Sequence, residues 1–218
     1  MREMYDEELA EFHDRLAELA ELAEDAMSKA TAALLGNDVI LAREVIEGDQ
    51  VVGDLHHELD QSAVELIARQ QPVARDLRTI VAGLRMSADL QRMGKLAKHV
   101  AELVERRYPR QSIPSSLRPR IADMGAVAVR IAGQAREAML SGDADAAQKI
   151  EREDDEMDEL QAGLYRQLIE GDGQADVETA VEVALLGRYY ERFADHAVLL
   201  ARRVAFAAGV RGAIRPQS

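Results

Sequence analysis

The chain lacks cysteine and tryptophan, has only 5 prolines, and contains 4% aromatic residues among its 218 residues. Without cysteine it cannot form a disulfide, a thiolate zinc site or a cysteine nucleophile. Its hydrophobic fraction of 47% is enough for a packed core, which Leu, Val, Ile, Ala and Met must fill. Because proline is scarce and alternating runs of Val, Ile and Thr are missing, the composition favours an all-α fold.

Positive charge is also in short supply. The chain has 27 Lys and Arg against 40 Asp and Glu, which gives a net charge of -13. Nucleic acids and anionic membranes would repel it, since binding to either depends on basic side chains. Basic proteins and metal cations are the partners that this charge favours. Residues 1–8 are acidic, and no apolar run approaches the roughly 20 residues of a membrane helix, so we expect a cytoplasmic protein.

Sequence signatures of catalysis are missing as well. The chain has no Gly-x-x-x-x-Gly-Lys loop, no Gly-x-Ser-x-Gly turn and none of the Glu-x-x-His pairs of a ferritin-like di-iron centre. Its five histidines are not spaced as a ligand set. We therefore do not expect an enzyme.

Apolar residues recur at helical spacing in six segments of the chain. The first two should cover about 4–35 and 38–69, with Gly36-Asn37-Asp38 ending one helix and capping the next. The two prolines and the serines of residues 108–116 indicate a linker between halves. We predict two tandem three-helix bundles with these limits: 1–108 for the first, 109–114 for the linker, 115–208 for the second, and 209–218 for a flexible tail.

The two halves repeat each other. The apolar stripe of the third helix matches that of the sixth at a constant offset of 100 residues, so that Leu90 corresponds to Tyr190 and Met93 to Phe193. The second helix matches the fifth at an offset of 105, which pairs Asp49 with Asp154. A repeat of this kind predicts two copies of one structural unit related by pseudo-symmetry.

The acidic residues of the second unit form two pairs at helical spacing, Asp154 with Asp158 and Glu191 with Asp195. Residues four apart lie on one helical face, where like charges repel unless a cation lies between them. Two such pairs on neighbouring antiparallel helices could supply four oxygen ligands to Mg²⁺, Mn²⁺ or iron. The alternative is a solvated acidic face, because Glu191 and Asp195 fall opposite the apolar stripe of their helix.

The first unit lacks most of these carboxylates. Asp49 remains at the place of Asp154, but Gly53, Gln91 and Lys95 stand at the places of Asp158, Glu191 and Asp195. A lysine would repel a metal ion, so we expect any metal to bind the second unit, with Asp49 only a weaker candidate.

The third helix begins with the distinctive segment Gln71-Pro72-Val73-Ala74-Arg75-Asp76-Leu77-Arg78. It can be interpreted as an ordinary helix start, with Asp76 favoured by the helix dipole and Arg75 and Arg78 exposed. The alternative is a docking site for a partner protein, formed by the same three residues.

Together with the repeat and the segments 89–94 and 190–197, this segment resembles the PhoU family of phosphate-transport regulators, over residues 5–205. The incomplete first repeat is similar to the actinobacterial branch. The resemblance implies two three-helix bundles and a cytoplasmic negative regulator of the phosphate-starvation response. Such a regulator links a phosphate ABC transporter to a sensor histidine kinase, meets the membrane only through these partners, and forms homodimers.

The family's Glu/Asp-x-x-x-Asp motif, which holds surface metal clusters, corresponds here to Asp154–Asp158 and Glu191–Asp195. In the first repeat only Asp49 matches. Two other functions stay open from the sequence: a metal-dependent enzyme or metal store built on these carboxylates, and a purely structural helical protein. Short loops between the stripes favour compact bundles over a long coiled coil.

Overall fold

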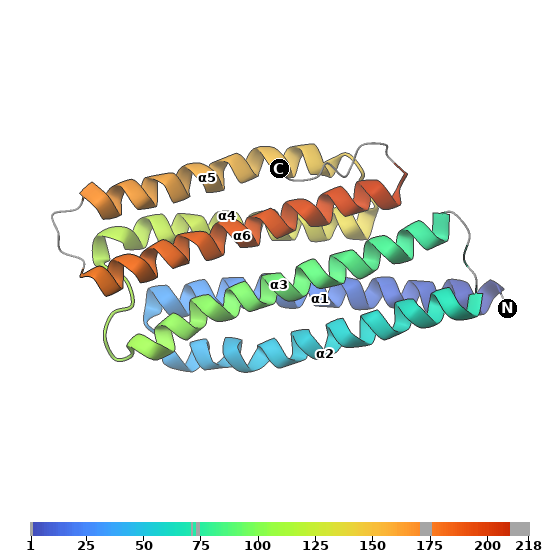
Figure 1. Ribbon diagram of the computed structural model, residues 1–218, viewed down its shortest axis with the longest axis horizontal. Helices are drawn as coiled ribbons and strands as arrows, with labels where there is room; N and C mark the ends of the chain where they lie inside the picture. The colour runs from blue at the N-terminus through green and yellow to red at the C-terminus, as the bar shows by residue number, and fades with distance from the viewer. Residues whose placement is uncertain (1, 71, 73–74, 171–175, 210–218) are drawn as a thin grey trace.

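The computed structural model describes residues 2–70, 72, 75–170 and 176–209. Within these ranges it is all-α, with no strand, as the composition predicted. The elements follow in this order (Figure 1): α1 (Arg2–Gly36), α2 (Val39–Gln70), α3 (Arg75–Arg107), the short 3-10 helix η1 (Ser115–Leu117), α4 (Arg118–Ser141), α5 (Ala146–Glu170) and α6 (Val177–Ala207). None of these helices is both long and apolar enough to cross a membrane, as far as the described ranges show.

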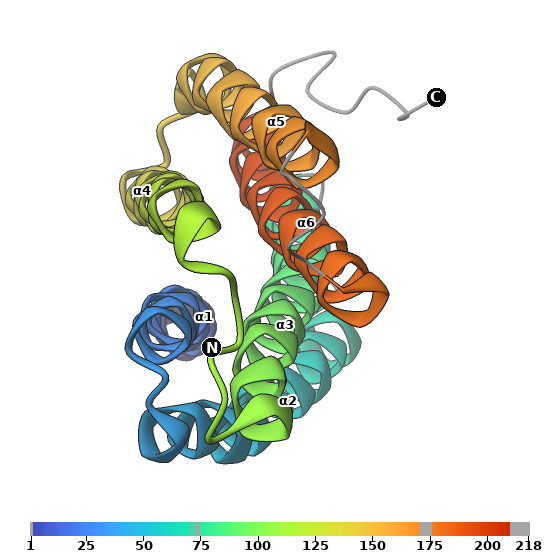
Figure 2. The same cartoon turned by 90° about the vertical axis from the view of Figure 1, so that its left-hand side faces the viewer.

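The helices form two three-helix bundles that lie side by side. α1, α2 and α3 pack against one another, and so do α4, α5 and α6. The bundles join along two lines, α1 against α4 and α3 against α6, which the end-on view in Figure 2 shows. The predicted architecture of three helices plus three is therefore confirmed.

Local signals in the sequence set the helix ends. Asp38 caps α2, because its Oδ1 accepts hydrogen bonds from the backbone N–H groups of Ile40 and Leu41 at 3.0 and 3.1 Å. Asp176 caps α6 in the same way, accepting from the N–H of Thr179 at 2.7 Å. Gly142 ends α4 with a φ of 69°, a left-handed conformation that glycine adopts without strain.

The segments outside the helices bear on the predicted domain limits. The predicted linker, 109–114, lies between the end of α3 and the start of η1. Of the predicted tail, 209–218, only Gly209 belongs to the described residues.

The core runs without interruption through both bundles. Fully buried aliphatic and aromatic side chains come from all the long helices, such as Leu19 in α1 and Phe193 in α6. One buried hydrogen bond joins the bundles: the hydroxyls of Thr31 in α1 and Tyr190 in α6 lie 2.9 Å apart. The Thr31 hydroxyl already donates to the carbonyl of Met27, so Tyr190 is the donor.

A buried ion cluster joins the bundles at their second line of contact. Asp89 of α3 is only 1% exposed, and its Oδ2 accepts a hydrogen bond of 2.5 Å from Nε of Arg203 in α6. The ring Nδ1 of His196, also in α6, lies 3.3 Å from Oδ1 of Asp89. Burial alone would raise the pKa of Asp89, but the neighbouring His196 and Arg203 outweigh burial and hold that pKa below its ordinary value.

Candidate functional site

The four carboxylates that the sequence singled out lie along the line where α5 packs against α6. Two hydrogen bonds join α5 and α6 near these carboxylates. Gln161 donates to the carbonyl of Gly187 at 3.2 Å, and the Tyr165 hydroxyl donates to the carbonyl of Ala184 at 3.3 Å. At Gly187 the helices are so close that a Cβ atom there would lie 3.0 Å from a methyl carbon of Leu164. This close packing brings the acidic faces of the two helices together.

The electrostatics of Asp154 show that the four carboxylates influence one another. Its pKa is raised to about 7, first because the side chain is half-buried, and then because of the negative charges of Asp195, Asp158 and Glu191. Burial also raises the pKa of Asp195. The structure therefore brings together all four residues in one acidic cluster.

The position of Glu191 argues against the solvated acidic face that the sequence left open. Its helical position opposite the apolar stripe of α6 suggested a solvent-facing side chain, yet that side chain is only 14% exposed. The reason is that α5 covers this side of α6, which no pattern within α6 can reveal. Burial, and after it the charge of Asp195, raises the pKa of Glu191. Asp158 is exposed, so for this residue the solvated interpretation holds.

Arg188 also belongs to the cluster, although the acidic pairs in the sequence did not point to it. Its Nη1 donates to both carboxylate oxygens of Glu191, at 2.8 and 2.9 Å. It lies three residues before Glu191 in α6, so helical spacing alone could have identified it. Its positive charge lowers the pKa of Glu191 and partly offsets the repulsion among the acids.

The donor chemistry of the cluster fits a hard cation. Carboxylate oxygens are the ligands that Mg²⁺, Mn²⁺ and iron accept, and a cation would relieve the repulsion that raises the pKa of Asp154. As the side chains stand in the described ranges, no three acidic or histidine groups converge closely enough to hold a metal ion. Binding one would require Asp154, Asp158, Glu191 and Asp195 to turn toward a common point.

Comparison with known proteins identifies the family of the chain. The model of the PhoU domain matches the chain twice, over residues 16–104 and 121–204. The chain belongs to the PhoU family. It is 46% identical to the phosphate-specific transport system accessory protein PhoU homolog 2 of Mycobacterium tuberculosis, over 95% of this chain and 98% of that protein. It is 45% identical to PhoU homolog 1 of Mycobacterium leprae, over 95% of this chain and 94% of that protein.

Solved structures of PhoU proteins share the fold. The crystal structure of PhoU from Pseudomonas aeruginosa superposes with a TM-score of 0.84 at 26% identity, covering 94% of this chain and 98% of that one. PhoU from Streptococcus pneumoniae gives a TM-score of 0.85 at 22% identity, covering 94% and 97%. The second likeness shows the fold alone.

In the first PhoU repeat the structure replaces the carboxylate cluster with an ion pair. Asp49, the counterpart of Asp154, accepts a hydrogen bond of 3.0 Å from Nζ of Lys98 in α3, and this bond raises the pKa of Lys98. Lys95, which the sequence placed at the position of Asp195, is exposed, and the lysine that pairs with Asp49 is Lys98. Lys98 stands at the place of Val198, outside the family motif, so the motif could not reveal it.

The segment at the start of α3 lies away from the carboxylate cluster. Arg75 begins the helix, Asp76 is partly buried, and Arg78 is exposed. The guanidinium of Arg78 lies 5.8 Å from the centre of the Phe206 ring in α6, a cation–π contact that links the two helices. The docking role of these residues stays a prediction.

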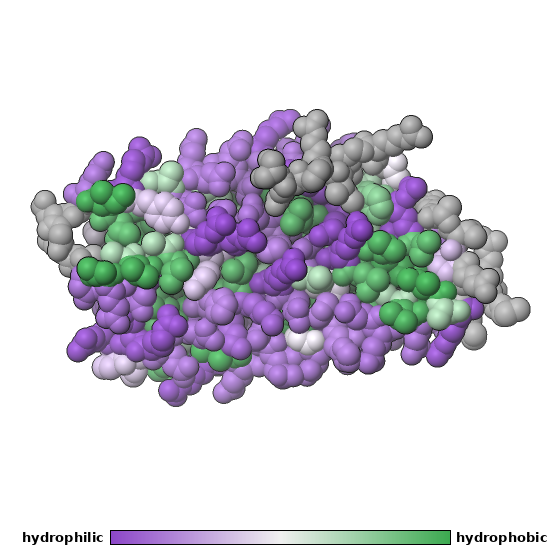
Figure 3. All heavy atoms as spheres, in the orientation of Figure 1, coloured by the Kyte–Doolittle hydropathy of each residue, from purple (hydrophilic) through white to green (hydrophobic). Residues whose placement is uncertain are grey.

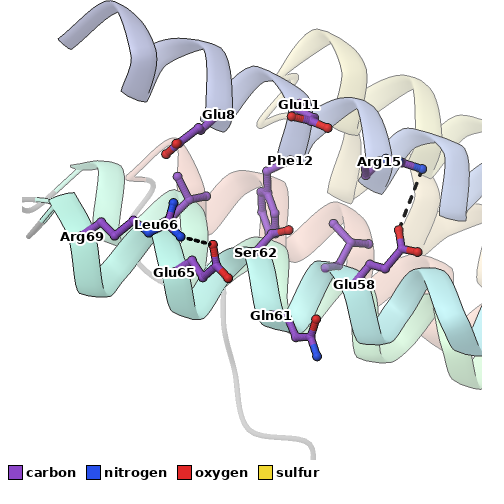
Figure 4. Close-up of a pocket in the computed structure, with 11 residues that line it drawn as sticks. Glu8, Glu11, Phe12, Arg15, Glu58, Gln61, Ser62, Glu65, Leu66 and Arg69 are labelled. Carbon is purple, nitrogen blue, oxygen red and sulfur yellow. Dashed lines mark ion pairs between the residues drawn. The ribbon is translucent and has the colours of Figure 1, made fainter. Parts of the chain in front are cut away.

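A groove of about 320 Å³ lies between α1 and α2, apart from the cluster (Figure 4). Acids and two arginines line its rim, and each arginine lies near one acid: Arg69 is 3.0 Å from Glu65, and Arg15 is 4.0 Å from Glu58. The side chain of Phe12 at its floor is buried. The groove is thus a charged, partly paired surface between two helices, and none of the residues that line it forms a catalytic arrangement.

Proposed function

We propose that the protein is a cytoplasmic negative regulator of the phosphate-starvation response. In this role it couples a phosphate ABC transporter to a sensor histidine kinase, and it modulates phosphate uptake. The observation that carries the proposal is the end-to-end match to mycobacterial relatives named phosphate-specific transport system accessory proteins. The match covers both repeats, so the whole double bundle is shared with the relatives.

The character of the surface supports an adaptor rather than an enzyme. Several of its charged side chains form ion pairs between helices, such as Arg130 with Glu153 at 2.9 Å and Arg136 with Glu24 at 2.9 Å. Long amphipathic helices with such a surface suit a protein that binds other proteins, and the transporter and the kinase are the partners that we propose. We further propose that the start of α3, with Arg75, Asp76 and Arg78, contributes to partner binding, and that the protein acts as a homodimer.

A deletion strain tests the regulatory role. Without the gene, phosphate-scavenging genes should be expressed in phosphate-rich medium, and the intact gene supplied on a plasmid should repress them again. A transcriptional reporter for the high-affinity transporter measures both effects. Unchanged reporter activity in the deletion strain, under conditions where phosphate starvation still induces the reporter, would refute the role.

We also propose, as a second function, that the cluster on α5 and α6 binds a divalent or iron-type metal. The observation that supports it is the position of the four carboxylates along the contact of α5 and α6, where burial, followed by the charges of Asp195, Asp158 and Glu191, raises the pKa of Asp154. Asp154, Asp158, Glu191 and Asp195 would hold the ion, and its charge would neutralise theirs. Such an ion would serve as a structural or signalling element on the surface.

Elemental analysis of protein purified without a metal-affinity tag tests this second function. We expect bound metal in the wild type and its loss in the double variant Glu191→Ala, Asp195→Ala. The matched control is Asp123→Ala, Glu137→Ala, which removes two exposed acids from α4. Equal metal content in the wild type and the Glu191/Asp195 variant would exclude the cluster as the site.

A further inference from the structure

Two apolar patches lie on the face of the molecule that α3 and α6 present. The first half of α6 exposes Val177, Val181 and Leu185, which follow one another at steps of four residues and are 82%, 55% and 43% exposed. Residues at this spacing form one stripe along the helix. Exposed apolar stripes of this length are unusual for a side of a helix that faces water alone.

The first half of α3 carries the counterpart of this stripe. At the offset of 100 residues that relates the two helices, Leu77 corresponds to Val177 and Val81 to Val181. Leu77 is exposed and Val81 is partly exposed. The third position differs, since Arg85 stands at the place of Leu185.

The two patches lie at opposite ends of the same face. α3 and α6 pack side by side and run in opposite directions, so that their first halves are far apart (Figure 1). Figure 3 shows the two apolar areas near the two ends of this face, with a hydrophilic band between them. The patches are thus related by the same pseudo-two-fold symmetry as the repeats.

The band between the patches is rich in arginine. Arg92 of α3 and Arg192 of α6 are equivalent at the offset of 100, and both are exposed. Arg85 and Lys95 of α3 are exposed too, and no ion pair of either is found among the described residues. Arg92 lies 3.9 Å from Oδ1 of Asp89. α3 carries more basic than acidic residues, although the chain as a whole has the opposite balance.

We propose that this face docks a homodimeric protein whose two subunits contact the two patches in equivalent ways. Each subunit would cover one patch with the same apolar segment, and acidic side chains near the partner's two-fold axis would face the arginine band. The equivalence of the patches favours a partner with two identical contact segments, and the basic band favours an acidic one. The inference rests on the proposed adaptor function and deepens it by naming the docking surface and the symmetry of the partner.

Site-specific photo-crosslinking in living cells tests this docking surface. A photoreactive amino acid replaces Val81 in one strain and Val181 in another, and mass spectrometry identifies the peptide that each one captures. We expect both positions to capture the same peptide segment of one homodimeric protein. The matched control is Val64 of α2, which is 62% exposed and does not belong to the face; it should not capture that segment.

Three outcomes overturn the proposal. Capture of different segments from the two positions would show an asymmetric partner. Capture of a second copy of this chain would show self-association, and no capture at either position would show an unused surface. A captured homodimer that belongs to neither the transporter nor the kinase would refute the proposed partners while leaving the docking surface intact, so the two failures can be told apart.

Charge reversal of the band gives an independent measurement. The double variant Arg85→Glu, Lys95→Glu should lower the yield of crosslinks at both Val81 and Val181 by about tenfold, since complementary charges across a docking face speed association and disfavour other partners. Arg166→Glu, on the exposed side of α5, is the control and should leave the yield unchanged. An equal yield in the double variant and the control would refute the acidic character of the partner.

Discussion

Replacing Asp89 with alanine should destabilise the protein through the junction of its two bundles. The carboxylate is 1% exposed and neutralises Arg203, whose side chain is 19% exposed. Removing one member of a buried ion pair generally costs 3–5 kcal/mol, since the remaining charge stays buried without a partner. Arg203 reaches some water, so we expect the lower end, about 3 kcal/mol in the free energy of unfolding.

For a protein of this length, a loss of about 3 kcal/mol corresponds to a fall in Tm of about 6–12 °C. Urea unfolding followed by circular dichroism at 222 nm measures the free energy, and a thermal scan measures Tm. The control is Asp123→Ala, at an exposed position of α4, which should change the free energy by less than about 0.5 kcal/mol.

The double variant Asp89→Ala, Arg203→Met sharpens this test. It removes the charge of Arg203 as well as that of Asp89, so no unpaired charge stays buried and the double variant should recover part of the stability lost in the single variant. If Asp89→Ala costs less than about 1 kcal/mol, or if the double variant is no more stable than the single one, the ion pair does not hold the bundles together and the reasoning is wrong.

The pH dependence of this junction follows from the direction of its pKa shift. The pKa of Asp89 is lowered from its ordinary value of 3.8, so the folded state favours the ionised carboxylate. Its contribution is fully present above pH 3.8 and is lost as the pH falls through the lower pKa of the folded state. Asp89→Ala should therefore lose most of its difference from the wild type in strongly acidic buffer.

Further predictions concern packing and charge elsewhere in the molecule. Tyr190→Phe should cost about 1 kcal/mol in urea unfolding, because Thr31 keeps its bond to a backbone carbonyl and only the bond between the bundles is lost. Gly125→Ala should lower the free energy of unfolding by about 1–3 kcal/mol, because the new Cβ would lie 2.4 Å from a buried methyl carbon of Thr31. Gly48→Ala should raise the free energy of unfolding by about 0.5–1 kcal/mol, because its Cβ would meet open space in the middle of α2. The opposite signs of the two changes are the test. The pKa of Asp154 is raised to about 7, so between pH 4 and pH 7 the folded state holds a proton that the unfolded chain has lost. In metal-free buffer the free energy of unfolding should therefore fall as the pH rises through this range, and Asp154→Asn should reduce the fall. An identical pH profile in the variant would contradict the shift.

The sequence predicted the helices and the repeat because both depend on local and periodic information. The apolar stripe of Leu90 and Met93 repeats in Tyr190 and Phe193, and all four side chains are buried in the structure. The cap at Asp38 was also predictable, since a capping side chain bonds to backbone groups only two or three residues away.

The candidate site was predictable only in part. Helical spacing identified Asp154, Asp158, Glu191 and Asp195, but it left open whether Glu191 faces solvent. The periodicity of one helix shows which residues share a face, and it does not show which other helix covers that face. The exposure of Glu191 and the pKa of Asp154 both depend on how closely α5 approaches α6.

The sequence by itself determined an all-α double repeat of the PhoU family, because residue spacing fixes both the helical stripes and the relation between the halves. Only the tertiary structure decided which charges meet. Lys98 neutralises Asp49 from 49 residues away, and Arg203 reaches Asp89 from 114 residues away. Such pairs depend on the register between packed helices, which is set by the fit of their side chains across the contact and leaves no periodic trace in either helix.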